Sequence, residues 1–592
     1  MMKSLWIPTP PLTSFLLVGL SLCGTVAGQT CDLTVKTHIE NLPGFSPVPA
    51  VTDTEIAVGP ESVLACSNSY FTILSKINGA ELARAEIGNH PNPVPANPFF
   101  LTNTIHTQSS IGDPVVYYDY HSERFWIVAV EVRLFLLPPF GDPYPVYGHF
   151  RIAVSTSSAP LLDADSWLQF DFKVYENTVG GVYNPNGPFT PPSTSEPAIL
   201  SHNEMIAVDQ HSLYITSYEQ EFYDANDPNN QNRTGTIYVF DKASLLANQL
   251  PNPQVFKPWN AHNRDTWGEL VAVEHMHWNN THPAYTIVTG NPPTFPGTAQ
   301  DTILLGALTR DPFTGNYTFA EKSVTGAHGL PAWNNPPQRV STPDPAHKMD
   351  LIIGRFLHAS YVPDDSVNSG RIYTTHHIQN ATDPTRSIVR WYVFATNGWP
   401  MTPGAQPSVV QWGDIKDGDS EGLSYYDPSI AVDATRHVGL VWTQCGEELL
   451  PEFWMGSRMP SDTPGTIPFR SLRASQSSLV MQSDGNKADY SGCEPDPSAT
   501  CRFWGHSPLV RDLGSSSNMW ETHVSRVCVP CEPATTDFAG EPADLNCDGV
   551  TDVLDLAVFS ALYTAGNQAV DFDATGTVDG FDALYYTSLM QK

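Results

Sequence analysis

The segment Asp427-Pro428-Ser429-Ile430-Ala431-Val432-Asp433 carries the pattern that decides the fold of this chain. Its apolar run ends in an aspartate, and the form recurs as Ile206-Ala207-Val208-Asp209 and, with a final glycine, as Ile56-Ala57-Val58-Gly59. A short apolar run bounded by turn residues is typical of a strand buried on both faces. Each run precedes a second strand-like segment, so the pattern predicts a strand–turn–strand unit that repeats along the chain.

A second recurring form begins with aspartate and proline. Asp113-Pro114-Val115-Val116-Tyr117-Tyr118-Asp119 also places a strand between Asp-Pro and a later aspartate, and Ser195-Glu196-Pro197 resembles its start. From residue 31 to about 527, runs rich in β-branched and aromatic residues alternate with clusters of turn residues. The chain holds 52 Pro and 41 Gly, and this region has hardly any helical periodicity, which predicts an all-β main domain.

The repeating units favour a β-propeller. About 500 residues at the usual ~45 per blade would give ~11 blades, above the common range of 4–8, so we expect roughly six to eight blades with long loops. Tandem β-sandwiches are the alternative, because they also alternate strands and turns. Segments 427–442 and 112–130 resemble those of uncharacterised secreted bacterial proteins with propeller-like repeats, a resemblance that implies no particular activity.

Two acidic 12-residue loops lie near the C-terminus, and they begin at Asp544 and Asp571. Both place oxygen-bearing side chains at loop positions 1, 3, 5, 9 and 12, with glycine at position 6. This is the spacing of a calcium loop, in which alternate residues point inward and the glycine makes the sharp turn. Apolar residues at helical spacing follow each loop, so the sequence predicts a small all-α module of two packed helices rather than a solvated acidic tail.

The tail, residues 542–592, resembles the dockerin type I family. The resemblance implies two bound calcium ions and the following ligands, position by position: Asp544, Asn546, Asp548, the Val550 carbonyl, Asp552 and Asp555 in the first loop, and Asp571, Asp573, Thr575, the Thr577 carbonyl, Asp579 and Asp582 in the second. Thr575 is neutral at position 5, which should weaken the second site. Dockerins bind their partner through positions 10 and 11, here Val553-Leu554 and Gly580-Phe581, so a cohesin-like or cell-surface protein is the implied partner of 542–592.

Charge and the N-terminus indicate where the protein acts. With 30 basic and 62 acidic residues the net charge is −32, which argues against nucleic acid or an anionic membrane surface as partner. Lys3, an apolar run over residues 15–22 and small residues at 26–28 predict a signal peptide over 1–28, too short to span a bilayer. We therefore expect a protein that is secreted, extracellular or on the cell surface, with no transmembrane span.

The predicted domains are the signal peptide (1–28), the propeller-like domain (29–527), a Pro-containing linker (528–541) and the dockerin-like module (542–592). Eight cysteines remain after cleavage, and an even number in an exported chain favours disulfides. Cys493 and Cys501 flank a short loop and are the pair we predict. Cys528-Val529-Pro530-Cys531 has the spacing of half a zinc knuckle, but no second pair lies at a suitable distance, so disulfides are favoured there also.

Few stretches of the main domain carry a chemical signature. His275-Met276-His277 would place two imidazoles on one face of a strand, as in a metal pair, although polar residues on an exposed strand face look the same. His376-His377 would direct its rings to opposite faces. No nucleophile elbow, zinc-protease helix or phosphate-binding glycine loop is present.

A glycosidase needs two carboxylates that converge within ~5–10 Å. Asp113, Glu196, Asp427 and Asp489 are candidates because each begins or ends a predicted inner strand, but aspartates that recur with a repeat favour a structural role in turns. We therefore assign no catalytic and no cofactor-binding residue in the main domain. The sequence predicts a secreted calcium-binding, non-catalytic binding or scaffold protein that is displayed or assembled through its dockerin-like C-terminal module, with carbohydrate as one candidate partner. The alternative is a carbohydrate-active hydrolase with a propeller catalytic domain.

Overall fold

A computed structural model provides the fold. It describes residues 33–38, 53–68, 70–76, 79–87, 99–100, 108–136, 143–174, 198–222, 231–256, 271–275, 282–289, 299–337, 339–341, 349–351, 354–364, 369–416, 422–472, 491–499, 502–511 and 519–528, together with 556, 559, 560, 563 and 583. The chain divides into two compact units, residues 32–529 and the terminal segments 1–31 with 530–592.

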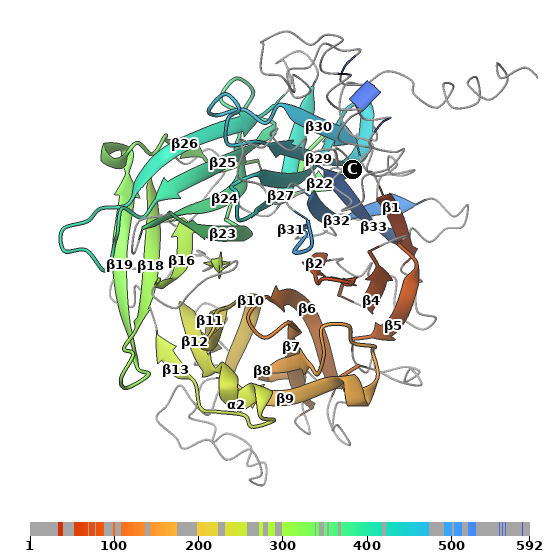
Figure 1. The fold of residues 1–592 in the computed structure, drawn as a ribbon, viewed down its shortest axis with the longest axis vertical. Helices are drawn as coiled ribbons and strands as arrows, with labels where there is room; N and C mark the ends of the chain where they lie inside the picture. Colours follow the sequence, from red (N-terminus) through yellow and green to blue (C-terminus); the bar gives the residue numbers. More distant parts are fainter. Residues whose placement is uncertain are drawn as a thin grey trace, which may run out of the picture. The chain divides into compact units, whose positions relative to one another are not determined.

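Residues 32–529 form a seven-bladed β-propeller (Figure 1). Each blade is an antiparallel sheet of about four strands, and the innermost strands surround the axis. The expectation of six to eight blades is confirmed, and the tandem β-sandwich alternative is wrong. The blades average about 70 residues, against ~45 in common propeller repeats, so long connections make up the difference.

The first four blades follow one another along the chain. From the innermost strand outward, they consist of β2 (Glu55–Val58), β3 (Ser62–Cys66), β4 (Tyr70–Ser75) and β5 (Glu81–Glu86) in blade 1; β6 (Gln108–Asp119), β7 (Arg124–Leu136), β8 (Pro143–Ser155) and β9 (Trp167–Lys173) in blade 2; β10 (Ala198–Val208), β11 (Ser212–Phe222), β12 (Gln231–Asp241) and β13 (Gln254–Phe256) in blade 3; and β14 (Val271–Ala272), β16 (Ala284–Thr289), β18 (Thr302–Arg310) and β19 (Tyr317–Thr325) in blade 4.

The remaining blades complete the ring. They consist of β23 (His358–Pro363), β24 (Gly370–Gln379), β25 (Ser387–Ala395) and β26 (Ser408–Ile415) in blade 5, with β15 (Glu274–His275) added to β23; β27 (Leu423–Val432), β28 (Val438–Gly446), β29 (Leu449–Arg458) and β30 (Phe469–Leu472) in blade 6; and β31 (Gly492–Pro495), β32 (Arg502–Arg511), β33 (Met519–Cys528) and β1 (Leu33–His38) in blade 7.

Other elements are short. Two-stranded pairs join β17 (Ala299–Gln300) to β20 (Trp333–Asn334) and β21 (Arg339–Val340) to β22 (Met349–Asp350). The helical segments of the propeller are η1 (Ala164–Ser166), α2 (Lys242–Leu246) and η2 (Gly326–His328). Within the described residues, no helix has the length and apolar character needed to cross a membrane.

The recurring Ile-Ala-Val runs are innermost strands with both faces buried. In β2, Ile56 and Val58 pack against blade 7, whereas Ala57 packs against blade 2. The same alternation holds in β10, where Ile206 and Val208 face blade 2 and Ala207 faces blade 4. Because successive strand residues point to opposite faces, a strand between two neighbouring blades must be apolar throughout. The hydrophobic core is therefore divided into clusters between adjacent blades.

The last blade is closed by the two ends of the propeller segment. Strand β1 pairs antiparallel with β33, from Leu33 opposite Arg526 to His38 opposite Glu521. The outermost strand of blade 7 thus comes from the N-terminal end, while its other three strands come from the C-terminal end. Closure of this kind removes the gap between the first and last blades without a covalent bond.

Aspartates at the ends of innermost strands cap the following turns. Asp209 Oδ1 accepts hydrogen bonds from the backbone nitrogens of His211 and Ser212, at 2.7 and 2.8 Å. Asp433 Oδ1 accepts them from Thr435 and His437, both at 2.9 Å. This is the Asx turn that an aspartate can form with its own backbone. The aspartates that end these two innermost strands therefore have a structural role in turns.

Three cysteines of the propeller have free, buried thiols, namely Cys66, Cys445 and Cys493. The predicted Cys493–Cys501 disulfide is therefore wrong. Cys493 lies in β31 opposite Gly505, and its side chain is enclosed in the sheet packing, with the pKa of the thiol raised by burial. Cys501, Cys528 and Cys531 lie outside the residues whose side chains the structure describes.

Candidate functional site

Three glutamates and one histidine meet at the axis of the propeller. Glu55 begins β2 of blade 1, and Glu494 lies in β31 of blade 7. Glu274 begins β15, which pairs in parallel with β23, and His358 begins β23. All four side chains are buried, with 5 to 6% of the surface of each residue exposed. The labelled innermost strands in Figure 1 show how segments from distant parts of the chain reach this centre.

The imidazole of His358 is the hub of this axial cluster. Its Nε2 lies 3.1 Å from Glu274 Oε1 and 3.6 Å from Glu494 Oε1. On the other side of the ring, Nδ1 lies 2.7 Å from the carbonyl oxygen of Ile430 in blade 6, to which it donates. The backbone of a neighbouring blade therefore orients the ring so that Nε2 faces the carboxylates.

Burial has the largest influence on the pKa values of the Glu55 and Glu494 carboxyl groups in the axial cluster. It raises the pKa of Glu55 to about 8, with the charge of Glu274 adding to the rise and that of His358 opposing it. It also raises the pKa of Glu494 well above its usual range, again with help from Glu274. For His358, burial works to lower the pKa, but the charges of Glu274 and Glu494 outweigh it and hold the imidazole pKa above its ordinary value. Desolvation and like charge thus favour protonated carboxyls here.

Two tyrosines of blade 2 lie near the same charges. Burial raises the pKa values of Tyr117 and Tyr120, and the charges of Glu274 and Glu494 raise them further. Both phenols therefore remain neutral at any physiological pH and are suited to hydrogen bonding rather than to acid–base exchange. Polar groups from blades 1, 2, 5, 6 and 7 thus surround one small region of the axis.

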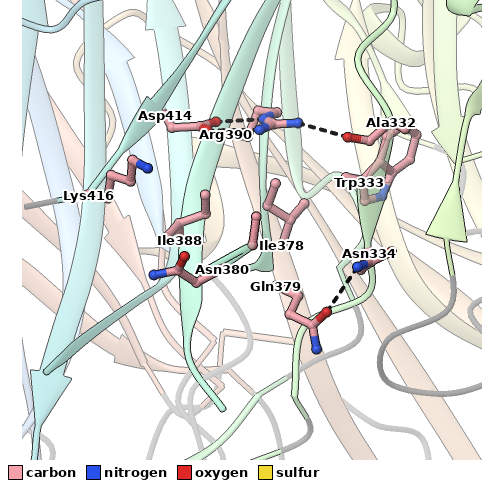
Figure 2. A pocket seen from close by; sticks show the side chains of 11 residues that line it. Ala332, Trp333, Asn334, Ile378, Gln379, Asn380, Ile388, Arg390, Asp414 and Lys416 are labelled. Atoms are coloured by element: carbon pink, nitrogen blue, oxygen red, sulfur yellow. Dashed lines mark hydrogen bonds and ion pairs between the residues drawn. The ribbon is translucent and has the colours of Figure 1, made fainter. Parts of the chain in front are cut away.

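A separate pocket of about 280 Å³ lies along blade 5 (Figure 2). Its wall combines isoleucines with amides and charged groups: Ala332, Trp333, Asn334, Ile378, Gln379, Asn380, Ala381, Ile388, Arg390, Asp414 and Lys416. The residues come from the ends of β24, β25 and β26 and from the β20 region. An apolar floor with a few convergent polar groups is the usual make-up of a small-molecule site.

The polar groups of this pocket are held in place by one another. Arg390 binds Asp414 through two hydrogen bonds of 2.6 and 2.8 Å and also donates to the Ala332 carbonyl. Its guanidinium lies over the Trp412 ring, 4.5 Å from the centroid. Such a bidentate, stacked arginine is rigid, so the pocket wall is preorganised.

The candidate aspartates of the sequence lie elsewhere. Asp113 and Asp427 each sit at a β-bulge within an innermost strand, with positive φ angles of 49° and 46°. We expected each aspartate to cap a turn at the start of a blade, and this expectation is wrong in detail. Each aspartate instead lies at a bulge, which bends the strand at the position where the following proline has no N–H to donate to the ladder. Asp113 donates its backbone N–H to Asn68 Oδ1 at 2.7 Å. Neither aspartate belongs to the axial cluster.

Several other predicted residues lie outside the described part of the chain. These are Glu196, Asp489, His277 and all twelve predicted calcium ligands of residues 544–582. His275 lies in β15, but its side chain is among those not described. His376 and His377 are fully buried within β24, so they are core residues of blade 5 and not a metal pair.

Sequence reasoning missed every member of the axial cluster. One signal was available: Glu55 immediately precedes the Ile56-Ala57-Val58 run, and Glu274 immediately precedes His275. A charge at the start of an innermost strand lies close to the axis of a propeller. However, no spacing rule along the chain connects the four members of the axial cluster. They are spread over blades 1, 5 and 7, and Glu274 and His358 of blade 5 lie more than 80 residues apart in sequence.

No known family profile and no curated protein matches this sequence. Among solved structures, a protein of unknown function from Dyadobacter fermentans is 10% identical with a TM-score of 0.30, over 70% of this chain and 94% of that one. An α-L-arabinanase of Penicillium chrysogenum, complexed with arabinobiose, is 10% identical with a TM-score of 0.27, over 69% and 92%. An N-acetylgalactosamine deacetylase from F. plautii is 11% identical with a TM-score of 0.26, over 58% and 86%. Such low likeness says nothing about function.

Proposed function

We propose that the protein is an exported, non-catalytic carbohydrate-binding propeller that is attached or assembled through a calcium-loaded C-terminal module. The observation that carries the carbohydrate part is the amide-lined pocket of blade 5. Sugar hydroxyls both donate and accept hydrogen bonds. Asn334 Nδ2 already donates to Gln379 Oε1, and Gln379 Nε2 donates to the Pro384 carbonyl, so the remaining N–H groups and lone pairs of these amides, beside an apolar floor, are what a ligand would use. The volume of about 280 Å³ suits a single sugar ring.

The choice of a binding role over hydrolysis rests on the carboxylates. The aspartates that recur with the blades cap turns, as Asp209 and Asp433 do. The carboxylates that do converge, Glu55, Glu274 and Glu494, are at least 94% buried and closely surrounded. A glycosidase needs room for a sugar between its carboxyl groups and for a water molecule. The closed axial cluster therefore favours a structural or ion-binding role.

The net charge narrows the ligand class. At −32 the protein repels polyanions, so a neutral polysaccharide fits better than a sulfated or uronate-rich one. Lys416 at the pocket adds only one local positive charge. We therefore expect binding to neutral glycans that depends little on salt concentration.

Co-sedimentation with neutral and anionic polysaccharides tests this role. The mature protein should bind a neutral polymer, and the double variant Gln379→Ala/Lys416→Ala should bind it about tenfold more weakly, because two hydrogen bonds at about 0.5–1.5 kcal/mol each are removed. Lys322→Ala on β19 of blade 4, a residue that does not line the pocket, is the matched control and should bind normally. Equal binding by the double variant would remove the blade 5 pocket from the proposal.

Release of reducing ends from the same polymers tests the hydrolase alternative. We expect none from the wild-type protein. Turnover that is present in the wild type and disappears in Glu274→Gln would replace the binding role with catalysis at the axial cluster.

The calcium module rests on the paired loop spacing of residues 544–555 and 571–582. In addition, five described residues are helical in the segments where the sequence predicts a helix after or around each loop: Leu556, Phe559, Ser560, Tyr563 and Ala583. The Phe559 and Tyr563 rings lie 5.5 Å apart, as neighbours one turn apart on a single helix face do. We propose that this module binds two calcium ions and a cohesin-like or cell-surface partner.

Calorimetric titration of the chelator-treated, full-length protein with calcium tests the module. Two binding events are expected, and Asp544→Ala should abolish one of them, because it removes a charged ligand from the first loop. Thr575→Ala should weaken the other only slightly, since threonine supplies a neutral oxygen. Unchanged calcium binding by Asp544→Ala would count against the module.

A further inference from the structure

The ion pairs of the axial cluster leave one carboxyl oxygen of Glu274 without a partner. Glu274 Oε1 lies next to His358, but its second oxygen, Oε2, is buried and has no hydrogen-bond partner. A carboxylate oxygen that is out of water and unpaired is costly to keep. Only 6% of the surface of this residue is exposed, so bulk solvent does not reach it freely.

We propose that Glu274, His358 and Glu494 form a binding site for one divalent transition-metal ion, such as Zn²⁺ or Mn²⁺, at the axis of the propeller. Each of the three offers one ligand atom, and these atoms all lie within 4.8 Å of one another. Donors bound at about 2.0–2.2 Å to a tetrahedral ion lie about 3.3–3.6 Å apart, so the two ligand atoms that are farthest apart must close by up to about 1.5 Å for all three to bind one ion.

The orientation of His358 suits a metal ligand. Its Nδ1–H donates to the Ile430 carbonyl at 2.7 Å, which leaves Nε2 directed at the two glutamates. Metal-binding histidines are usually fixed in this manner, with the second ring nitrogen held by a carbonyl or carboxylate. Blade 6 therefore supplies the outer support, while β15 and β23 of blade 5 and β31 of blade 7 supply the ligands.

The carboxyl groups of the region outnumber its basic groups and offer oxygen ligands to a cation. Glu55 lies beside Glu274 and His358, so three carboxyl groups face one imidazole. Among the described ion pairs, His358 is the only basic side chain joined to Glu274 or Glu494. A divalent ion would displace protons from these carboxyl groups when it binds and would provide a partner for Glu274 Oε2.

The mixed donor set selects the class of ion. Imidazole nitrogen together with carboxylate oxygen suits zinc, manganese and related ions, whereas calcium prefers oxygen alone. The proposed site therefore differs in chemistry from the all-oxygen loops of residues 544–582. The two kinds of site are separable by metal and by substitution.

Equilibrium dialysis of the chelator-treated, full-length protein, with elemental analysis of bound metal, tests the site. The wild-type protein should retain one Zn²⁺ or Mn²⁺ ion per chain. The Glu274→Gln variant should bind that metal at least tenfold more weakly, and both proteins should bind calcium equally. Glu131→Gln is the matched control: this buried carboxylate pairs with Arg151 at 3.3 Å in blade 2, and its loss should leave the metal bound.

Thermal unfolding separates a metal site from a structural ion pair. Without metal, Glu274→Gln should lose little thermal stability, because Glu494 still pairs with His358 in this variant. Added Zn²⁺ or Mn²⁺ should raise the midpoint of wild type and leave that of Glu274→Gln unchanged. Absence of bound metal in wild type, equal metal binding by Glu274→Gln, or a large loss of metal-free stability in that variant would each overturn the proposal.

Discussion

Buried lysines join neighbouring blades at the residue scale. Lys242, which follows β12 of blade 3, binds Asp119 at the end of β6 in blade 2 at 2.9 Å, and it also donates to the Asp209 carbonyl of its own blade. Lys76 repeats the arrangement between blades 1 and 7, with Asp496 at 2.5 Å and the Gly59 carbonyl at 2.8 Å. Each lysine thus ties the turn of its own blade to the preceding blade.

Removing one such lysine should be strongly destabilising. Lys242→Met leaves the Asp119 carboxylate buried without its cation, which costs about 3–5 kcal/mol. Urea unfolding followed by tryptophan fluorescence measures the change. Arg84→Met is the control, because Arg84 pairs with Glu81 at a largely exposed site where such pairs contribute under about 1 kcal/mol. Equal midpoints for the two variants would contradict the role of the buried pair.

At the scale of one element, β24 carries a histidine that must stay neutral. His376 Nδ1 donates to the Gly354 carbonyl at 3.0 Å, and its Nε2 accepts from the Tyr392 hydroxyl at 3.1 Å. The ring stacks on Phe356 with centroids 4.7 Å apart. Burial lowers the pKa of His376 from 6.5 to about 3. The folded blade therefore accepts only the neutral imidazole.

This histidine should make stability fall in acid. Between pH 6.5 and pH 3 the unfolded chain binds a proton that folded His376 does not, so stability rises with pH in this window and is lost as pH falls through it. From pH 7 to pH 5 the loss from this group is about 2 kcal/mol. Urea unfolding at both pH values should show that His376→Leu loses less stability on acidification than wild type.

A packing neighbour provides the control for this pH effect. Phe356→Leu weakens the same stack without removing a titratable group, so it should lower stability by a similar amount at pH 7 and pH 5. If His376→Leu and wild type lost the same stability on acidification, the buried histidine would not be the source of the dependence.

At the scale of the whole molecule, the ring depends on β1. This strand covers the outer edge of β33, and without it blade 7 would present unpaired backbone groups. An exposed strand edge both weakens the blade and invites pairing with another chain. The first described strand of the chain therefore stabilises the last.

Breaking the backbone ladder of β1 should open the ring. Val35 lies opposite Val524 in this ladder, and Val35→Pro removes a backbone donor in the middle of the strand. We expect a lower thermal midpoint and self-association in light scattering. Val35→Thr keeps the backbone donor and should remain monodisperse. A Val35→Pro protein with the wild-type midpoint would show that closure by β1 is dispensable.

Local patterns along the chain predict the architecture of the main domain and the calcium loops of the tail. The Ile-Ala-Val runs identify innermost strands because a strand between two blades is buried on both faces, a requirement that acts on consecutive residues. The prediction of calcium loops rests on a local pattern as well, since all six proposed ligand positions of each loop lie within 12 residues. The turn role of Asp209 and Asp433 is also local, because the acceptor and its donors lie two to four residues apart.

Only the tertiary structure brings the axial cluster together. Its four residues, Glu55, Glu274, His358 and Glu494, come from blades 1, 5 and 7, and no spacing rule relates them. The state of Cys493 is also decided by tertiary structure. Its thiol is free and buried inside the packed sheets, although Cys501 lies close to it in sequence. The physical reason is that blade closure, which depends on contacts between the two ends of the propeller segment, determines which innermost residues face one another across the axis.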